Sequence, residues 1–197
     1  MLKKRLTVDR KKSQIHRKSY NEVGHVHELT FSCYNNIKFF KSDVYCQWFA
    51  DSLSNACGSL KFSLWVYVFM PDHIHLIVHP EQSIYSISDF LKQVKQPFSR
   101  KVLSYLRSNS PEWLSRLKQI RGKTTEYHIW QRGGGYDRNV LDGETLLKMI
   151  DYIHLNPVRK EFVERVTDWK WSSAGWFEGI EPKTLRPDVI SKNWMTM

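Results

Sequence analysis

Cysteine is scarce in this 197-residue chain: Cys33, Cys46 and Cys57 are odd in number and form no Cys-x-x-Cys pair. This argues against a disulfide framework or a cysteine zinc site, and favours reduced thiols in a cytoplasmic protein. No apolar run reaches the roughly 18 residues that would cross a bilayer, and none follows the basic N-terminus as in a secretory signal. A phosphate-binding P-loop is also missing, because no Gly-Lys-Ser/Thr follows Gly133–Gly135. We therefore expect no membrane partner.

Acidic residues are almost missing from two segments of the chain. Residues 1–20 hold eight Lys and Arg against Asp9, and residues 91–123 hold nine against Glu112, in a chain of net charge +10. Concentrated positive charge favours a polyanionic partner, because each neutralised phosphate releases counterions. The alternative is a solvated tail and a solvated helix face. Charge alone does not separate DNA from RNA.

The chain is long enough for one folded domain. Hydrophobic residues make up 41% of it, which indicates a sizeable core. Residues 1–22 are polar and basic, and we interpret them as a flexible N-terminal arm. Residues 23–178 are interpreted as the folded domain, and residues 179–197 as a C-terminal tail.

Hydrophobic periodicity predicts an α+β fold. Strands are expected at residues 25–33, 62–70, 73–79 and 126–131, and helices at residues 44–57, 87–107, 111–120 and 143–155. Gly58 should end the first helix, Pro97 should kink or break the second, and Asp142 should cap the last. Residues 132–139 are typical of a glycine-rich loop. The order β-α-β-β-α-β-α predicts a ferredoxin-like antiparallel sheet with helices packed on one face.

Two histidines alternate in the third predicted strand, in the sequence MPDHIHL. Alternate side chains of a strand share a face, so His73 and His75 should point the same way, while Ile74 faces the core. Two imidazoles placed in this way can bind one divalent metal. The alternative is a pair of polar residues on a solvent-facing surface. His79 falls on the same face but is too distant to be a strong candidate.

A second group of polar residues lies at the end of the last predicted helix, in DYIHLNP. Tyr152 is off the apolar stripe of that helix, and Lys148 and Asn156 lie one turn before and after it. A phenol, an ammonium and an amide therefore project from one edge of the helix. Spacing alone is equally compatible with a half-buried tyrosine at a packing interface.

Four motifs together indicate a family. MPDHIHLIVHP, WQRGGGYDRN, MIDYIHLNPV and DWKWSS, in this order and spacing, resemble the REP-associated tyrosine transposases. These belong to the single-tyrosine branch of the HUH endonucleases, which are named for a His-hydrophobic-His motif. The resemblance covers about residues 25–177, nearly the whole folded part.

The resemblance implies a ferredoxin-like core with the His pair on a central strand. By this resemblance, His73 and His75 hold Mg²⁺ or Mn²⁺, Asn156 completes the metal site, and Tyr152 on the C-terminal helix is the nucleophile. The family cuts single-stranded DNA, often beside a hairpin, and leaves a 5′-phosphotyrosine bond and a free 3′-OH. The expected partner is thus hairpin-forming single-stranded DNA, bound by a monomer or a homodimer.

Basic residues near these motifs are the candidate DNA contacts: Lys148, Arg132 and Arg138. The segment that follows WQ departs from the usual family pattern, because this chain has three glycines and then Tyr136. Tyr136 is therefore a rival nucleophile, although a loop orients a phenol less firmly than a helix does.

Three other functions are compatible with parts of the pattern. One is a domesticated transposase that binds hairpin DNA and no longer cleaves it, although such a binder has no need of the His and Tyr set. Another is a metal-independent phosphoesterase, which would need two His-x-Thr motifs, whereas the one motif here ends in His75. The last is a ferredoxin-like RNA-binding module.

Overall fold

The computed structural model describes residues 21–122 and 124–195, so most of the predicted N-terminal arm lies outside the described residues. Its centre is an antiparallel sheet in the order β2-β3-β1-β6. The four strands are β1 (Val26–Ser32), β2 (Phe62–Phe69), β3 (His73–Pro80) and β6 (Tyr136–Val140). This order, with helices after β1 and β3, confirms the predicted ferredoxin-like fold.

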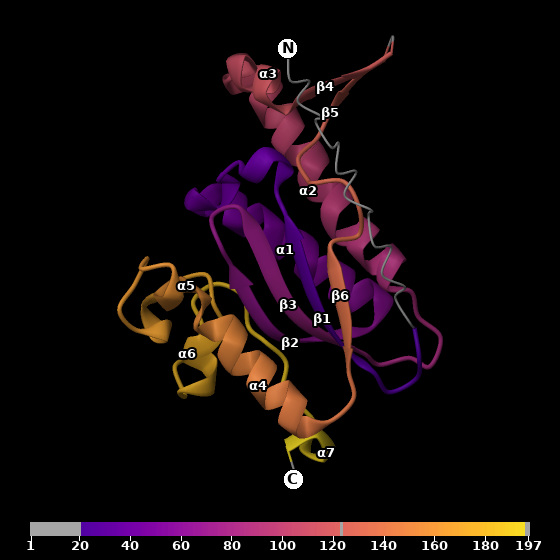
Figure 1. The fold of residues 1–197 in the computed structure, drawn as a ribbon, viewed down its shortest axis with the longest axis vertical. Coiled ribbons are helices and arrows are strands. Elements are labelled where there is room, and N and C mark those ends of the chain that lie inside the picture. The colour runs from indigo at the N-terminus through magenta and orange to yellow at the C-terminus, as the bar shows by residue number, and fades with distance from the viewer. Residues whose placement is uncertain (1–20, 123, 196–197) are drawn as a thin grey trace, which may run out of the picture.

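Two long helices cover one face of the sheet, as predicted. They are α1 (Asp43–Leu60) and α2 (Ile87–Asn109), drawn behind the sheet in Figure 1. Alternate strand residues such as Leu29, Phe31 and Leu76 join both helices in one buried cluster. Burial of this apolar surface is the main driving force for the layer, at about 25 cal/mol per Å².

A third helix, α4 (Gly143–His154), packs on the opposite face of the sheet and is seen at the lower left in Figure 1. Asp142 caps it as predicted, because its carboxylate accepts a hydrogen bond of 2.8 Å from the Thr145 amide. Ile150 and Ile153 of its apolar stripe pack on strand residues that alternate with those facing α1 and α2. The C-terminal half of α4 is thereby held against the sheet, where its main strand contact is β2.

Two helix boundaries differ from the prediction. Helix α1 continues past the exposed Gly58, and its C-cap is Lys61, which adopts the left-handed conformation with φ 56°. Helix α2 runs through Pro97 without a break. Val94 and Phe98 flank this proline and are fully buried, so packing outweighs the roughly 3 kcal/mol that an internal proline costs.

The fourth strand of the sheet was predicted in the wrong place. It is β6, within the segment that the sequence indicated as a glycine-rich loop. The strand predicted at residues 126–131 overlaps β5 (Thr124–Tyr127), which pairs only with β4 (Lys118–Arg121) in a separate ribbon among the described residues. In Figure 1 this ribbon projects from the end of α2.

The helix predicted at residues 111–120 is shorter in the structure. It consists of η3 (Pro111–Trp113) and α3 (Leu114–Leu117).

The C-terminal segment covers the edge strand β2 and supports α4. Backbone amides of Ser173 and Asp188 donate to carbonyls of β2, at 2.9 and 2.7 Å. Near the end of the described chain, the Trp194 carbonyl lies 2.5 Å from where a Cβ on Gly143 would stand, so only glycine fits at the start of α4. Short helices also occur between β1 and α1, namely η1 (Tyr34–Asn36) and η2 (Phe39–Lys41). Those that follow α4 are α5 (Asn156–Arg159), η4 (Val166–Asp168), α6 (Ala174–Phe177) and α7 (Lys192–Met195).

The described helices were also compared with what a bilayer requires. Across residues 21–122 and 124–195, none is both long enough and apolar enough to span a membrane.

His154, at the end of α4, should make stability depend on pH. Its imidazole is buried, its Nε2 lies 2.9 Å from the Ser173 hydroxyl, and burial lowers its pKa to about 4. Because the unfolded pKa is about 6.5, this histidine stabilises the fold above pH 6.5, and the contribution is lost as pH falls towards 4. We expect the contribution of His154 to the free energy of unfolding to fall by on the order of 3 kcal/mol between pH 7 and pH 4.

Urea unfolding of wild type and of His154→Gln at both pH values measures this contribution. The glutamine can still reach Ser173 but does not titrate, so the variant should lose less stability than wild type on acidification. If both proteins lose the same free energy of unfolding on acidification, His154 does not cause the pH dependence.

Candidate active site

The His pair lies on β3, an inner strand, and faces the side of the sheet that α4 covers. The Nε2 atoms of His73 and His75 are 3.1 Å apart. Each ring is held through its other nitrogen: His73 Nδ1 donates to the Asp72 carboxylate at 2.6 Å, and His75 Nδ1 lies 2.8 Å from the Thr30 hydroxyl. Thr30 is directly opposite His75 in the pairing of β1 with β3. The strand register thus orients both Nε2 atoms towards one point.

His75 is kept in its neutral form. Its side chain is only 6% exposed, and burial, with a smaller contribution from His73, lowers its pKa to about 3. A neutral imidazole has a free lone pair, which a metal ligand needs. Protons therefore do not compete for this lone pair near neutral pH.

The geometry of the pair suits an octahedral cation. Two nitrogens at neighbouring corners of an octahedron with bonds of about 2.1 Å lie about 3.0 Å apart, whereas tetrahedral ligands lie about 3.4 Å apart. The observed 3.1 Å is nearer the first value. A hydrogen-bond partner on the second ring nitrogen, such as Asp72 for His73 or Thr30 for His75, is typical around metal-bound histidines. Among residues 21–122 and 124–195, no group of three or more His, Cys, Asp or Glu side chains could hold a metal. Water or phosphate oxygens would have to fill the other positions.

A cavity of about 410 Å³ lies beside the pair, between α4 and the sheet. It brings together His75 and Tyr152, which are far apart in the sequence. Tyr152 is 47% exposed, and the Arg159 guanidinium lies 4.9 Å from the centre of its ring. The residues that line the cavity are Glu28, Thr30, His75, Tyr136, Arg138, Met149 and Tyr152.

Most of the other predicted site residues, His73 included, are not among the residues that line this cavity. Asn156 is buried, and its Nδ2 donates to the carbonyls of Tyr152 and Ile153 at 3.0 and 3.2 Å, so its amide caps the end of α4. Lys148 is exposed and paired with Glu144. Of the three predicted DNA contacts, Arg138 alone lines the cavity.

Arg132, the third of those contacts, lies in the loop that leads to β6. Its guanidinium is 3.1 Å from the Glu126 carboxylate, and both side chains are partly exposed. The ion pair joins the loop to the β4–β5 ribbon. In this arrangement Arg132 stabilises the position of the loop through its ion pair with Glu126.

Sequence reasoning missed Glu28. This carboxyl group is on β1, opposite Arg138 of β6, and its side chain is only 4% exposed. Burial raises its pKa, and the Arg138 charge opposes part of that rise. The available signal was the only acidic residue of β1, two positions before Thr30 and therefore on the same face.

Tyr136, the rival nucleophile, also lines the cavity. It is the first residue of β6 and pairs with Thr30 of β1, so it lies on a strand and not in a loop as predicted. Both candidate phenols therefore reach the same space.

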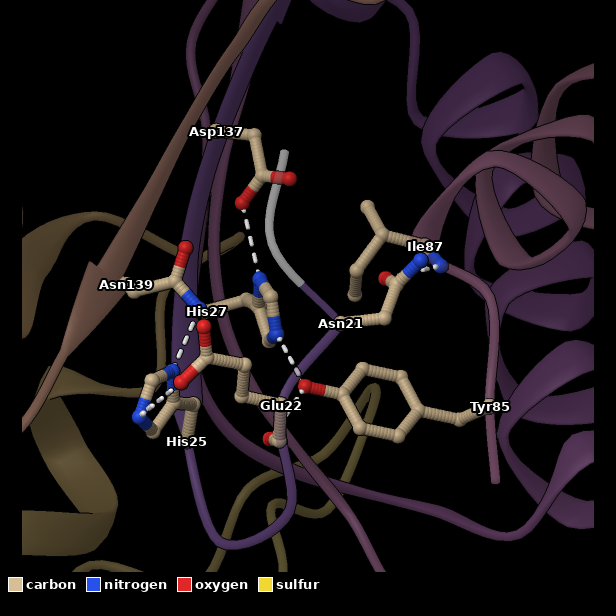
Figure 2. Close-up of polar contacts among 8 residues, drawn as sticks. All are labelled: Asn21, Glu22, His25, His27, Tyr85, Ile87, Asp137 and Asn139. Atoms are coloured by element: carbon tan, nitrogen blue, oxygen red, sulfur yellow. Dashed lines mark hydrogen bonds and ion pairs between the residues drawn. The ribbon is translucent and has the colours of Figure 1, made fainter. Parts of the chain in front are cut away.

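A polar network on the other face of the sheet holds β6 in place. His27 is fully buried, with Nδ1 2.8 Å from the Asp137 carboxylate and Nε2 2.9 Å from the Tyr85 hydroxyl, as Figure 2 shows. The Tyr85 hydroxyl donates in turn to the Glu22 carbonyl at 2.7 Å. Asp137 lies between Tyr136 and Arg138 in the chain, so this network fixes the edge strand that carries two cavity residues.

Comparisons with known proteins agree with this geometry. The family model described as "Transposase IS200 like" matches residues 23–156. A REP-associated tyrosine transposase of Haemophilus influenzae is 26% identical over 171 residues, which is 87% of this chain and 88% of that protein. A solved structure of a REP-associated tyrosine transposase bound to a REP hairpin shares the fold, with a TM-score of 0.66 at 19% identity over 90% of this chain and 94% of that one. The family match spans more than half of the chain and contains the His pair, the cavity and Tyr152, so this chain belongs to the IS200-like transposase family.

Proposed function

We propose that this transposase nicks and rejoins single-stranded DNA through a covalent bond to Tyr152, with a divalent cation held by His73 and His75. The observation that carries the proposal is the shared cavity, in which Tyr152 of α4 and His75 of β3 line the same space. The 3.1 Å separation of the two Nε2 atoms supports the metal site. Mg²⁺ and Mn²⁺ both accept octahedral coordination.

The residues of the cavity have distinct parts in this reaction. The Tyr152 oxygen attacks the scissile phosphorus and forms the 5′-phosphotyrosine bond, while the bond to the 3′-oxygen breaks. The Arg138 guanidinium attracts the phosphate into the cavity, since two parallel N–H groups suit its oxygens. A bound divalent ion would polarise the phosphate and stabilise its charge in the transition state. Asp72 and Thr30 hold the two imidazoles in place. The new bond keeps the phosphodiester energy, so rejoining needs no ATP.

We propose hairpin-forming DNA as the substrate. A related protein of the same fold has been solved with a REP hairpin bound. The net charge of +10 favours a nucleic acid partner. Half-exposed aromatic rings such as that of Tyr152 can stack on unpaired bases beside a hairpin stem.

The test is an assay for the covalent intermediate. Purified protein, Mn²⁺ and labelled single-stranded hairpins from the DNA that flanks the gene are mixed and separated on a denaturing gel. A protein–DNA adduct that disappears with a chelator supports the proposal. Tight hairpin binding without an adduct, at any metal tested, would favour the non-catalytic binder.

Thr30→Val should weaken metal binding without touching a metal ligand. The valine keeps the shape of the side chain but removes the hydroxyl that lies 2.8 Å from His75 Nδ1. Loss of such a partner weakens metal affinity by about 10–100-fold. Titration calorimetry with Mn²⁺ measures the change, and Thr125→Val on the exposed ribbon is the matched control. Equal affinities in the two variants would show that the hydroxyl does not orient His75.

A further inference from the structure

The Glu28 carboxylate has an unusual position. It is almost completely buried, at 4% exposure, yet it lines the same cavity as Tyr152. Within residues 21–122 and 124–195, no hydrogen bond or ion pair reaches it, and Arg138 acts on it only through its charge. Its oxygens are not among the fully buried unpartnered side-chain atoms of these residues, so the carboxylate keeps an open side towards the cavity and can meet a proton donor there.

The surroundings of Glu28 favour a group that exchanges protons. Burial raises its pKa, so its carboxylate is a stronger base than an exposed glutamate. The ionisable groups that line the cavity with it are His75 of β3, Tyr136 and Arg138 of β6, and Tyr152 of α4. Only Arg138 among these is a permanent cation, and it limits the rise in pKa.

The proposed reaction needs a proton acceptor at this place. A tyrosine has a pKa of about 10, so its phenol must lose a proton to become a good nucleophile. Thr30 and Met149 are not bases, and Arg138 stays protonated. His75 is neutral, but its two nitrogens are engaged with Thr30 and His73. Glu28 is the carboxylate among the lining residues.

A role as metal ligand fits less well. Among the described residues, Glu28 does not join His73 and His75 in a group that could hold a metal. In the pairing of β1 with β3 it lies opposite Ile77, two positions from His75. The carboxylate is instead opposite Arg138 of β6, in the part of the cavity that would receive the phosphate.

We propose that Glu28 accepts the proton of Tyr152 during cleavage and returns it during rejoining. This inference rests on the proposed function. In cleavage, the Tyr152 oxygen bonds to phosphorus, its proton passes to Glu28, and the departing 3′-oxygen takes a proton from water. In rejoining, the 3′-hydroxyl gives its proton to water as it attacks phosphorus, and the released Tyr152 oxygen recovers the proton from Glu28.

Glu28→Gln tests the proposal, because glutamine keeps the shape but cannot accept a proton. We expect the rate of adduct formation at pH 7 to fall by about 10²–10³-fold, within the range for lost general-base catalysis. Hairpin affinity and Mn²⁺ affinity should stay within about twofold of wild type, because neither contact is removed. Asp151→Asn is the matched control: it also removes one negative charge, directly beside Tyr152 on α4, but does not line the cavity.

Two further measurements separate a proton acceptor from a structural residue. Incorporation of a fluorinated tyrosine at position 152 makes the phenol more acidic, so the penalty of Glu28→Gln should shrink at least about tenfold. The variant should also melt about 2–4 °C higher at pH 7, because a buried charge is removed. Since its folded pKa is raised, Glu28 costs stability only where it is ionised, so this gain should fade as pH drops.

The outcomes distinguish this inference from the proposed function. A wild-type rate in Glu28→Gln, with the adduct still dependent on Tyr152, would overturn the role of Glu28 alone. Lost Mn²⁺ affinity would make Glu28 a metal ligand, and lost hairpin affinity would make it a DNA contact; either result overturns the proton-transfer role. If wild type binds hairpins but forms no adduct, both proposals are wrong.

Discussion

Tyr152→Phe should reduce formation of the protein–DNA adduct by more than about 10³-fold, the scale expected when a nucleophile is removed. The change deletes one oxygen atom and leaves the aromatic ring that the Arg159 guanidinium contacts at 4.9 Å. Hairpin affinity should therefore stay within about twofold of wild type. Quantified denaturing gels measure the adduct, and fluorescence anisotropy with labelled hairpins measures binding.

Tyr136→Phe is the control for this experiment, since its phenol lines the same cavity from β6. We expect it to keep most of the cleavage activity. The reverse result, an adduct that survives in Tyr152→Phe and disappears in Tyr136→Phe, would identify Tyr136 of β6 as the nucleophile. Loss in both variants would indicate that the two phenols act together.

His75→Ala should weaken Mn²⁺ binding by more than about 100-fold and remove the adduct with it, because one of the two proposed imidazole ligands disappears. His75 is the member of the pair that lines the cavity with Tyr152. Its loss therefore affects both the metal and the face of the cavity that meets the phosphate. Calorimetric titration with Mn²⁺ and the adduct assay report the two effects separately.

His79→Ala provides a matched comparison on the same strand and face. The His79 ring is stacked on Trp65, with ring centres 4.8 Å apart, and it does not line the cavity. It should retain wild-type Mn²⁺ affinity and cleavage, even if the lost stacking lowers the melting temperature. Equal metal affinity in His75→Ala and wild type would contradict the proposed metal site.

These two variants also decide between an enzyme and a binder. A protein that only binds hairpin DNA should keep its affinity and its function when the hydroxyl of Tyr152 or the imidazole of His75 is removed. The geometry favours an enzyme, because Thr30 and Asp72 hold both imidazoles in the orientation that a shared cation would require. Cleavage assays on both variants and wild type test this directly.

Much of the fold could be predicted from local pattern. Strands β1, β2 and β3 and helix α4 lie within one or two residues of the predicted ranges, and Asp142 caps α4 as expected. Their signals are local, because alternation or helical periodicity of apolar residues is visible in a short window. The alternation of His73 and His75 on one face of β3 follows from the same rule.

Strand β6 could not be predicted, and the reason is physical. Tyr136 and Arg138 face the cavity, while Asp137 and Asn139 face the polar side that includes His27 and His25. Neither face of the strand is apolar until Val140, so the usual alternation is missing. Its pairing with β1 is a tertiary contact between segments about 110 residues apart, as Figures 1 and 2 show.

The sequence by itself determined the family resemblance, the ferredoxin-like order of elements and the candidate residues His73, His75 and Tyr152. Only the tertiary structure decided which of these share a cavity and that Glu28 lies there as well. It also placed Asn156 at the end of α4, outside the cavity. The reason is that a side chain's face depends on its local period, whereas its neighbours across the sheet depend on strand register and on how α4 packs.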